Sequence, residues 1–189
     1  MKAFSVLIAS LLFLAGNIAS AQDYKADSKN TVIDWTGKKI SGKHYGKITL
    51  KEGSFSISDN RISSGKFIID MNSITCEDLT GGTAQKLVGH LKSDDFFSTG
   101  KYGVSTLEIT SGEPFKNNEA VVTGKLTIKD ITHPVTFTVK RTGTTYTSTV
   151  TVDRTLYNIR YGSGKFFQNL GDNMIDDNFT LDVRIQAIQ

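Results

Sequence analysis

The chain has 189 residues, a formal net charge of +3 at pH 7 and 38% hydrophobic residues, which suits one globular domain with its own core. Its positive charges are interspersed with negative ones and form no basic cluster, so nucleic acid is not expected as a partner. The single cysteine, Cys76, cannot form a disulfide within the chain, so folding has to depend on the core alone.

The N-terminal residues have the composition of a secretory signal peptide. Lys2 supplies one positive charge, an apolar run from Phe4 to Ala15 follows, and Ala19-Ser20-Ala21 matches a small-residue cleavage site. The apolar run is short for a membrane span, although a retained membrane anchor is the alternative. We therefore divide the chain into a signal peptide, 1–21, and one domain, 22–189. The expected location is periplasmic or secreted, without stable membrane insertion.

Short stretches of alternating apolar and polar residues follow one another along the rest of the chain. This period of two marks strands with one buried face. The apolar positions that show it include Ile33, Trp35, Ile48, Leu50, Phe55, Ile57, Phe67, Ile69, Leu107, Ile109, Val122, Leu126, Ile128, Val135, Phe137, Val139, Tyr146, Val150, Val152, Phe179, Leu181, Val183 and Ile185. Tight connections such as Ser58-Asp59-Asn60 separate the stretches. The arrangement predicts an all-β antiparallel sandwich or barrel.

One interval departs from the alternation. Leu87 and Leu91 have helical spacing, and Thr80 or Thr83 can cap the start of a helix. We predict one short helix near residues 80–92. A single helix in an otherwise all-β chain is expected to cover or plug one opening of a barrel.

The segment HLKSDDFFSTGKY, residues 90–102, directly follows this helix. It could be a catalytic acid site, a helix end docked on the core, or a lid over an apolar cavity. Hydrolysis of glycosides needs two carboxylates that face one bond, and adjacent residues of a strand point to opposite sides. Neither Asp94-Asp95 nor Asp176-Asp177 forms such a site by itself. We interpret both pairs as parts of solvated turns and helix ends.

No pattern in the sequence indicates a metal site or a catalytic nucleophile. His44, His90 and His133 lie far apart and lack metal-ligand spacing. The sequence also lacks a Gly-x-Ser-x-Gly elbow and a phosphate-cradling loop. These patterns favour neither a metal site nor a catalytic nucleophile.

Aromatic residues are more abundant than a small barrel needs in order to close, with 11 Phe, 6 Tyr and one Trp. Several of them stand next to polar turns, among them Phe96-Phe97, Tyr157 and Tyr161. They could be core and rim packing, or they could line a cavity with a polar mouth, the common form of a small-molecule site. An eight-stranded barrel has an interior wide enough for one small ligand.

Four segments carry a family resemblance. They are Gly42-x-His44-x-Gly46, the stretch from His90 to Phe97 followed by Lys101-Tyr102, the stretch from Val122 to Phe137 that includes Ile131-Thr132-His133-Pro134, and Asp153-Arg154-Thr155. Together they resemble the YceI-like family, secreted bacterial proteins that bind polyisoprenoids and related lipids. The resemblance covers nearly all of residues 22–189 in one order. One departure is Gly103, where the family usually has proline.

The resemblance implies an extended, eight-stranded antiparallel barrel, similar to a lipocalin, with a helix near one end. It also implies a long apolar cavity that takes an isoprenoid or fatty chain. It implies no catalytic residues, so we expect none, and no metal and no cofactor other than a bound lipid. The residues expected to line it are Trp35, Ile48, Phe55, Phe67, Leu87, Leu91, Phe96, Phe97, Leu107, Leu126, Phe137 and Tyr157. The candidates for the mouth and the lipid head group are His44, His90 and Tyr161.

The expected function is that of a secreted or periplasmic binding protein that holds an isoprenoid or other long-chain lipid as carrier, scavenger or store. Two alternatives stay open. One is a barrel enzyme that uses Asp94, Asp95, His90 or His44 as acid or base on a lipid substrate. The other is a filled, structural barrel with an interaction role. A homodimer is also considered, because barrel edges can pair. The identity of the lipid is left open.

Overall fold

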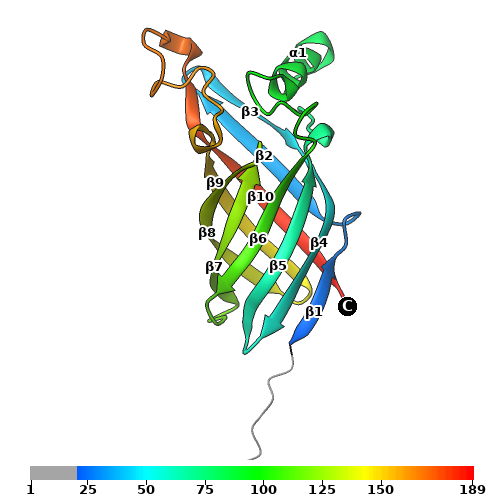
Figure 1. Cartoon of the computed structure of the whole chain (residues 1–189). Helices are drawn as coiled ribbons and strands as arrows, with labels where there is room; N and C mark the ends of the chain where they lie inside the picture. The colour runs from blue at the N-terminus through cyan, green and yellow to red at the C-terminus, as the bar shows by residue number, and fades with distance from the viewer. Residues whose placement is uncertain (1–20) are drawn as a thin grey trace, which may run out of the picture.

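The computed structural model describes residues 21–189, so the predicted signal peptide lies outside the described residues except for Ala21. Ten strand segments form one sheet in the order β1-β4-β5-β6-β7-β8-β9-β10-β2-β3, with a further pairing of β1 with β10 (Figure 1). The segments are β1 (Gln22–Ala26), β2 (Val32–Lys39), β3 (Gly42–Lys47), β4 (Thr49–Ser58), β5 (Arg61–Asp70), β6 (Val104–Gly112), β7 (Glu119–Ile128), β8 (Ile131–Thr142), β9 (Thr145–Asp153) and β10 (Ile175–Ile188).

The ten segments amount to eight strands of a closed barrel. β1 and β2 pair antiparallel with successive parts of the long β10, so they are two halves of one strand, separated by the turn at 27–31. β3 and β4 are likewise two parts of one strand, joined at Ile48, because β3 pairs with β2 and β4 pairs with β1. This ring confirms the predicted eight-stranded, antiparallel, lipocalin-like barrel.

The alternation in the sequence becomes the inward and outward faces of the strands, as β7 shows most clearly. Ala120, Val122, Leu126 and Ile128 are buried, whereas Val121, Thr123, Lys125 and Thr127, which alternate with the inward positions, are exposed or half-buried. Position 124 belongs to the inward series but has to be glycine. A Cβ there would lie 2.7 Å from the Glu108 carbonyl oxygen on β6, closer than two strands can tolerate.

Helix α1 (Gly81–Lys92) is the one α-helix of the described residues and lies at one end of the barrel, as Figure 1 shows. It confirms the helix predicted near 80–92. Thr80 occupies the N-cap position, but its side chain makes no capping hydrogen bond. At the other end, the Ser93 hydroxyl donates to the His90 carbonyl at 2.8 Å and ends the helix. No helix within residues 21–189 is long and apolar enough to cross a membrane.

The two aspartate pairs have different surroundings. Asp94 and Asp95 are exposed in the turn after α1, as interpreted from the sequence, while the neighbouring Phe96 is buried. Asp176 and Asp177 instead lie in β10, and one carboxylate oxygen of Asp177 is 3.7 Å from the buried guanidinium of Arg154. The interpretation of this second pair as a solvated turn is therefore wrong, because a buried cation draws one of its carboxylates inward.

The seam between β8 and β9 is held loosely. The two strands form backbone pairs only next to their hairpin, from Thr142 opposite Thr145 to Lys140 opposite Thr147. Beyond these pairs the Ser148 hydroxyl donates to the Thr138 carbonyl at 2.7 Å. A side chain thus bridges the strands where the backbone ladder has stopped.

Candidate functional site

An apolar cavity runs through the barrel interior. Its volume is about 210 Å³, which is far more than a single buried water molecule occupies. Its walls are the inward faces of the strands, so nearly all lining groups are aliphatic or aromatic. The short segment before α1 and the turn after it contribute Ile74, Phe96 and Phe97. The cavity therefore has an almost wholly apolar surface.

Ten of the twelve residues predicted for the lining face this cavity. They are Trp35, Ile48, Phe55, Phe67, Leu91, Phe96, Phe97, Leu107, Leu126 and Phe137. The alternation placed most of them, because it fixes which side of the sheet a strand residue occupies. Whether each one contacts a bound lipid stays a prediction.

Leu87 and Tyr157 do not line the cavity, so the prediction of their position is corrected. Leu87 lies on α1, is half-buried and packs against the core. Tyr157 is buried in the short helix η2 (Arg154–Tyr157), with its ring centroid 5.3 Å from that of His133. Burial raises the pKa of Tyr157 to about 12. Both residues contribute to the packing of the core and not to the lining of the cavity.

Aromatic rings fill the end of the barrel near β1. The ring of Phe55 stacks on Tyr24 with centroids 5.2 Å apart and meets the edge of Tyr146 at 4.9 Å. The ring centroid of Phe67 is 6.3 Å from that of Phe55. Aromatic packing of this kind adds to the stabilisation from burial alone. A guest in the cavity would therefore have this cluster at one end and α1 near the other.

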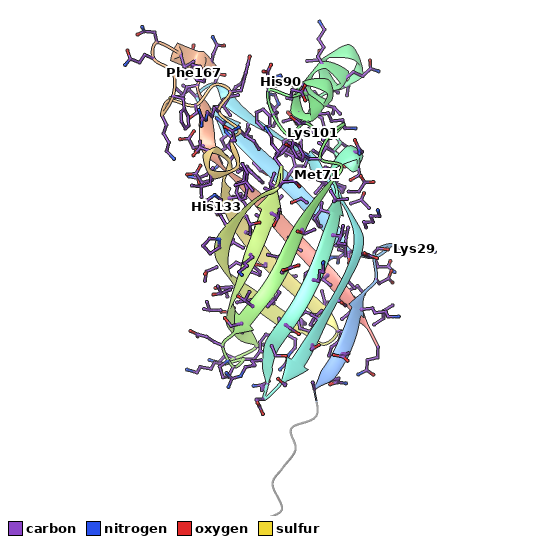
Figure 2. The ribbon with its side chains drawn as sticks, in the orientation of Figure 1. Lys29, Met71, His90, Lys101, His133 and Phe167 are labelled. Atoms are coloured by element: carbon purple, nitrogen blue, oxygen red, sulfur yellow. The ribbon has the colours of Figure 1, made fainter. Side chains whose placement is uncertain are left out.

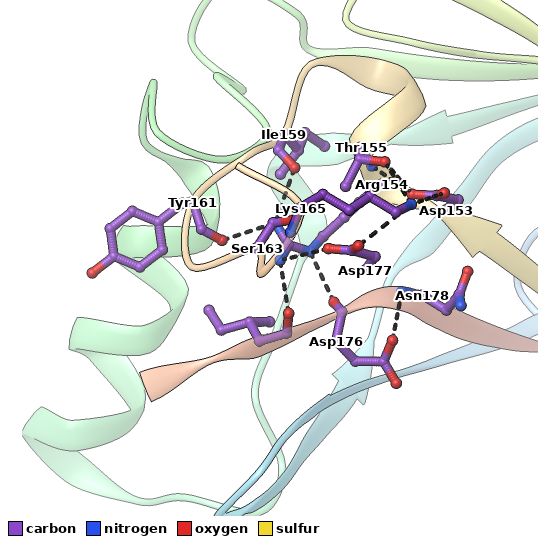
Figure 3. Close-up of polar contacts among 11 residues, drawn as sticks. Asp153, Arg154, Thr155, Ile159, Tyr161, Ser163, Lys165, Asp176, Asp177 and Asn178 are labelled. Carbon is purple, nitrogen blue, oxygen red and sulfur yellow. Dashed lines mark hydrogen bonds and ion pairs between the residues drawn. The ribbon is translucent and has the colours of Figure 1, made fainter. Parts of the chain in front are cut away.

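Arg154 is a charged side chain that the sequence places at the start of η2 and the fold buries, leaving it 1% exposed. It lines the cavity at the α1 end together with Asp176 and Asn178. Its guanidinium donates to four backbone carbonyls at 2.9–3.1 Å, those of Ile159, Tyr161, Ile175 and Asp176 (Figure 3). Burial lowers the pKa of Arg154, and nearby aspartates oppose that shift. The four hydrogen bonds tie the segment 155–174 to β10.

An ion-pair cluster supports the same segment from the solvent side. The Lys165 ammonium lies 2.8 Å from a carboxylate oxygen of Asp153 and 3.4 Å from one of Asp177. Burial acts to raise the pKa of Asp153, but the ion pair with Lys165 and the hydrogen bonds from Thr155 outweigh it, so the pKa is lowered. Figure 3 shows these side chains converging between β9 and β10.

Two of the three predicted mouth residues come together. The ring of His90 on α1 packs against Tyr161 with centroids 4.4 Å apart and against Phe96 at 5.6 Å. The Nε2 atom of His90 is buried without a hydrogen-bond partner among the described residues. Neither His90 nor Tyr161 lines the cavity itself. They form a contact between α1 and the segment 155–174 at the end of the barrel.

His44 lies apart from this contact. Its Nδ1 atom is 2.7 Å from one carboxylate oxygen of Asp78, whose other oxygen accepts the Tyr45 N–H at 2.9 Å. Burial acts to raise the pKa of Asp78, but the hydrogen bonds from Tyr45 and His44 outweigh it and lower the pKa. The half-buried Cys76 has its sulfur 3.4 Å from the same carboxylate. His44 thus holds the segment 75–78 on β3.

Arg154 is the functional-site residue that reasoning from the sequence missed. The sequence marked it only within the segment Asp153-Arg154-Thr155 that carries the family resemblance. An arginine directly after a strand of alternating apolar residues was the available signal. Its acceptors are backbone carbonyls from residues 159–176, and no side-chain pattern reports where those carbonyls point.

A closed eight-stranded barrel with one helix at its end and an apolar interior defines the class of lipocalin-like barrels. The family model for the YceI-like domain matches residues 24–187. The chain therefore belongs to the YceI-like family.

Individual proteins extend the comparison. A UPF0312 protein of Pseudomonas paraeruginosa is 31% identical over 142 residues, which cover 74% of this chain and 71% of that protein. The crystal structure of BcnA from Burkholderia cenocepacia superposes with a TM-score of 0.64 at 19% identity, over 87% of this chain and 99% of BcnA. A polyisoprenoid binding domain from Saccharophagus degradans superposes with a TM-score of 0.57 at 16% identity, over 87% and 97%. At these identities the two structures show a shared fold.

Proposed function

We propose that this protein is a periplasmic or secreted binding protein that holds an isoprenoid or other long-chain lipid inside the barrel, as carrier, scavenger or store. The observation that carries the proposal is the long cavity with an almost wholly apolar lining. The polyisoprenoid binding domain from Saccharophagus degradans, with the same fold, supports this class of ligand. Arg154, Asp176 and Asn178 at the α1 end would lie near the lipid head group.

The energetics of burial are sufficient for such a complex. A chain of about ten methylene groups gains up to ~8 kcal/mol on burial, at ~0.8 kcal/mol for each group. Association costs of several kcal/mol reduce this value. Longer chains or a favourable head-group contact bring the net free energy to about −8 kcal/mol, which corresponds to micromolar affinity. Binding does not need an ion pair with the ligand.

The geometry favours binding over catalysis. The acid and base candidates His44, His90, Asp94 and Asp95 are not among the residues that line the cavity. Arg154 does line it, but its donors are engaged by four backbone carbonyls. Asp176 is the one carboxylate among the lining residues, and no histidine, lysine or cysteine of the described residues lines the cavity beside it. A catalytic acid or base has to reach the reacting atoms of a substrate together with its partner groups, so we assign the lining no catalytic role.

Native mass spectrometry after gentle purification tests the proposed function. We expect the protein to carry a lipid of defined mass, and we expect organic extraction to release it. The emptied protein should then take up a fluorescent polyisoprenoid or fatty-acid probe. A protein that is empty as isolated and that binds neither probe would contradict the proposal and favour a filled, structural barrel. A probe that is converted to a product would favour the enzyme.

A further inference from the structure

Exposed apolar side chains gather at the end of the barrel that carries α1. Ile40 is 59% exposed, Phe166 45%, Phe167 49% and Met174 37%. Ile40 lies in the turn between β2 and β3, and the others lie in the segment 160–174, which includes the short helix η3 (Gly171–Asn173). The Ile40 N–H donates to the Met174 carbonyl at 3.2 Å, so the two parts form one surface. Figure 2 shows that Phe167 and His90 both lie at this end of the barrel.

Unpaired positive charges surround these apolar groups. Lys38 and Lys43 are exposed and stand directly opposite each other on β2 and β3, an unfavourable arrangement for like charges. Arg160 lies over the ring of Phe166, with 4.8 Å from the guanidinium carbon to the ring centroid. Neither these residues nor Lys39 form an ion pair within the described part of the chain.

The two groups together are called the tip surface below. Residues 36–45 contain no acidic residue, and Asp172 is the exposed acid of the segment 160–174. Contact with anions reduces the electrostatic repulsion among the cations of this surface. Apolar side chains flanked by lysine and arginine are typical of protein surfaces that lie in the interface of a bilayer. Both features are met at once by an anionic phospholipid surface.

We propose that the tip surface docks on an anionic phospholipid bilayer. Ile40, Phe166, Phe167 and Met174 enter the head-group region, and the cations lie among the lipid phosphates. Tyr161, in the same segment, packs against His90 at the α1 end of the barrel, where Arg154, Asp176 and Asn178 line the cavity. Docking therefore brings the α1 end of the barrel, and with it the polar end of the cavity, to the membrane. The inference rests on the proposed function, because it places the cavity where a long-chain lipid is taken up or delivered.

Vesicle sedimentation tests the docking and uses the exported form of the protein, purified after export by its host. The probes are extruded vesicles of phosphatidylcholine alone and of phosphatidylcholine with an equal amount of phosphatidylglycerol. Two tip variants are compared with the wild type: Ile40→Ser with Phe167→Ser, and Lys38→Gln with Lys43→Gln. Matched controls change the same kinds of residue far from the tip surface: Val121→Ser with Ile188→Ser, and Lys25→Gln with Lys116→Gln. Thermal melts and uptake of a fluorescent polyisoprenoid are measured for every variant.

We expect the wild type to bind the anionic vesicles and to bind phosphatidylcholine vesicles at least tenfold more weakly. Each tip variant should lose roughly tenfold or more in its partition coefficient, with unchanged melting and unchanged probe uptake, and the controls should match the wild type. The proposal would be overturned if the wild type does not bind the anionic vesicles. It would also be overturned if the partition coefficients of the controls fall as much as those of the tip variants. A dimer that dissociates in the tip variants would overturn it in favour of a second copy. If probe uptake is absent in the wild type as well, the proposed function fails, whatever the vesicles show.

Discussion

Phe96 and the two aspartates before it have different roles in the turn after α1. Asp94 and Asp95 are exposed, whereas Phe96 is buried and lines the cavity. Replacing both aspartates by asparagine should therefore cost at most about 1–2 kcal/mol of unfolding free energy, the size of a lost cap or turn bond. Phe96→Ala should cost about 3–5 kcal/mol and weaken lipid binding. Urea unfolding and probe titration measure both effects, and an equal loss in the two variants would show that the acids do more than shape the turn.

Asp153 makes the stability depend on pH. Its pKa is lowered in the folded protein, where Lys165 and Thr155 stabilise the carboxylate. A lowered folded pKa contributes stability that is present above the unfolded value, near 3.9, and is lost as pH falls through the folded pKa. Asp153→Asn should be less stable than wild type at pH 7, and the difference should shrink below about pH 4. Thermal melts between pH 7 and pH 2 measure this, and a difference that is constant over that range would contradict it.

The seam between β8 and β9 is where the barrel wall should open most readily. β9 pairs with β10 along its length, from Asn178 opposite Asp153 to Gln186 opposite Thr145, but its ladder with β8 is confined to the hairpin end. Amides of β9 that face β8 beyond Thr147 should exchange with solvent at least tenfold faster than those that face β10, because local opening exposes unpaired groups first. Hydrogen exchange followed by NMR resolves the two sets. Equal protection would show that the strands stay closed in solution.

Some elements could be predicted from the sequence for a physical reason. The faces of β7 follow from a strict period of two, and the end of α1 follows from helical spacing up to Leu91. The interruption of the first two barrel strands, at 27–31 and at Ile48, was not predicted. It is set by how β1 and β2 share β10 as a neighbour, and pairing between distant segments leaves little trace in local patterns.

At the scale of the whole molecule, the interior surface was predictable and its polar end was not. Alternation identified inward residues such as Phe67 and Leu126, since the pleat decides their side. Arg154 is held by carbonyls from residues 159–176, and Leu87 and Tyr157 are outside the cavity lining because of where α1 and η2 lie in the fold. These positions follow from the assembly of the closed barrel, which no single segment encodes.

The central claim is that the barrel interior holds one long apolar chain, and titration with a chain-length series of isoprenoid or fatty lipids tests it most directly. We predict that affinity rises about tenfold for every two methylene groups and then levels off when the cavity is full. Val122→Phe, which adds bulk to a fully buried lining residue, should move the plateau to shorter chains. Val121→Phe, on the exposed face next to it, should leave the plateau unchanged. An affinity independent of chain length, or the same plateau in both variants, would contradict the account.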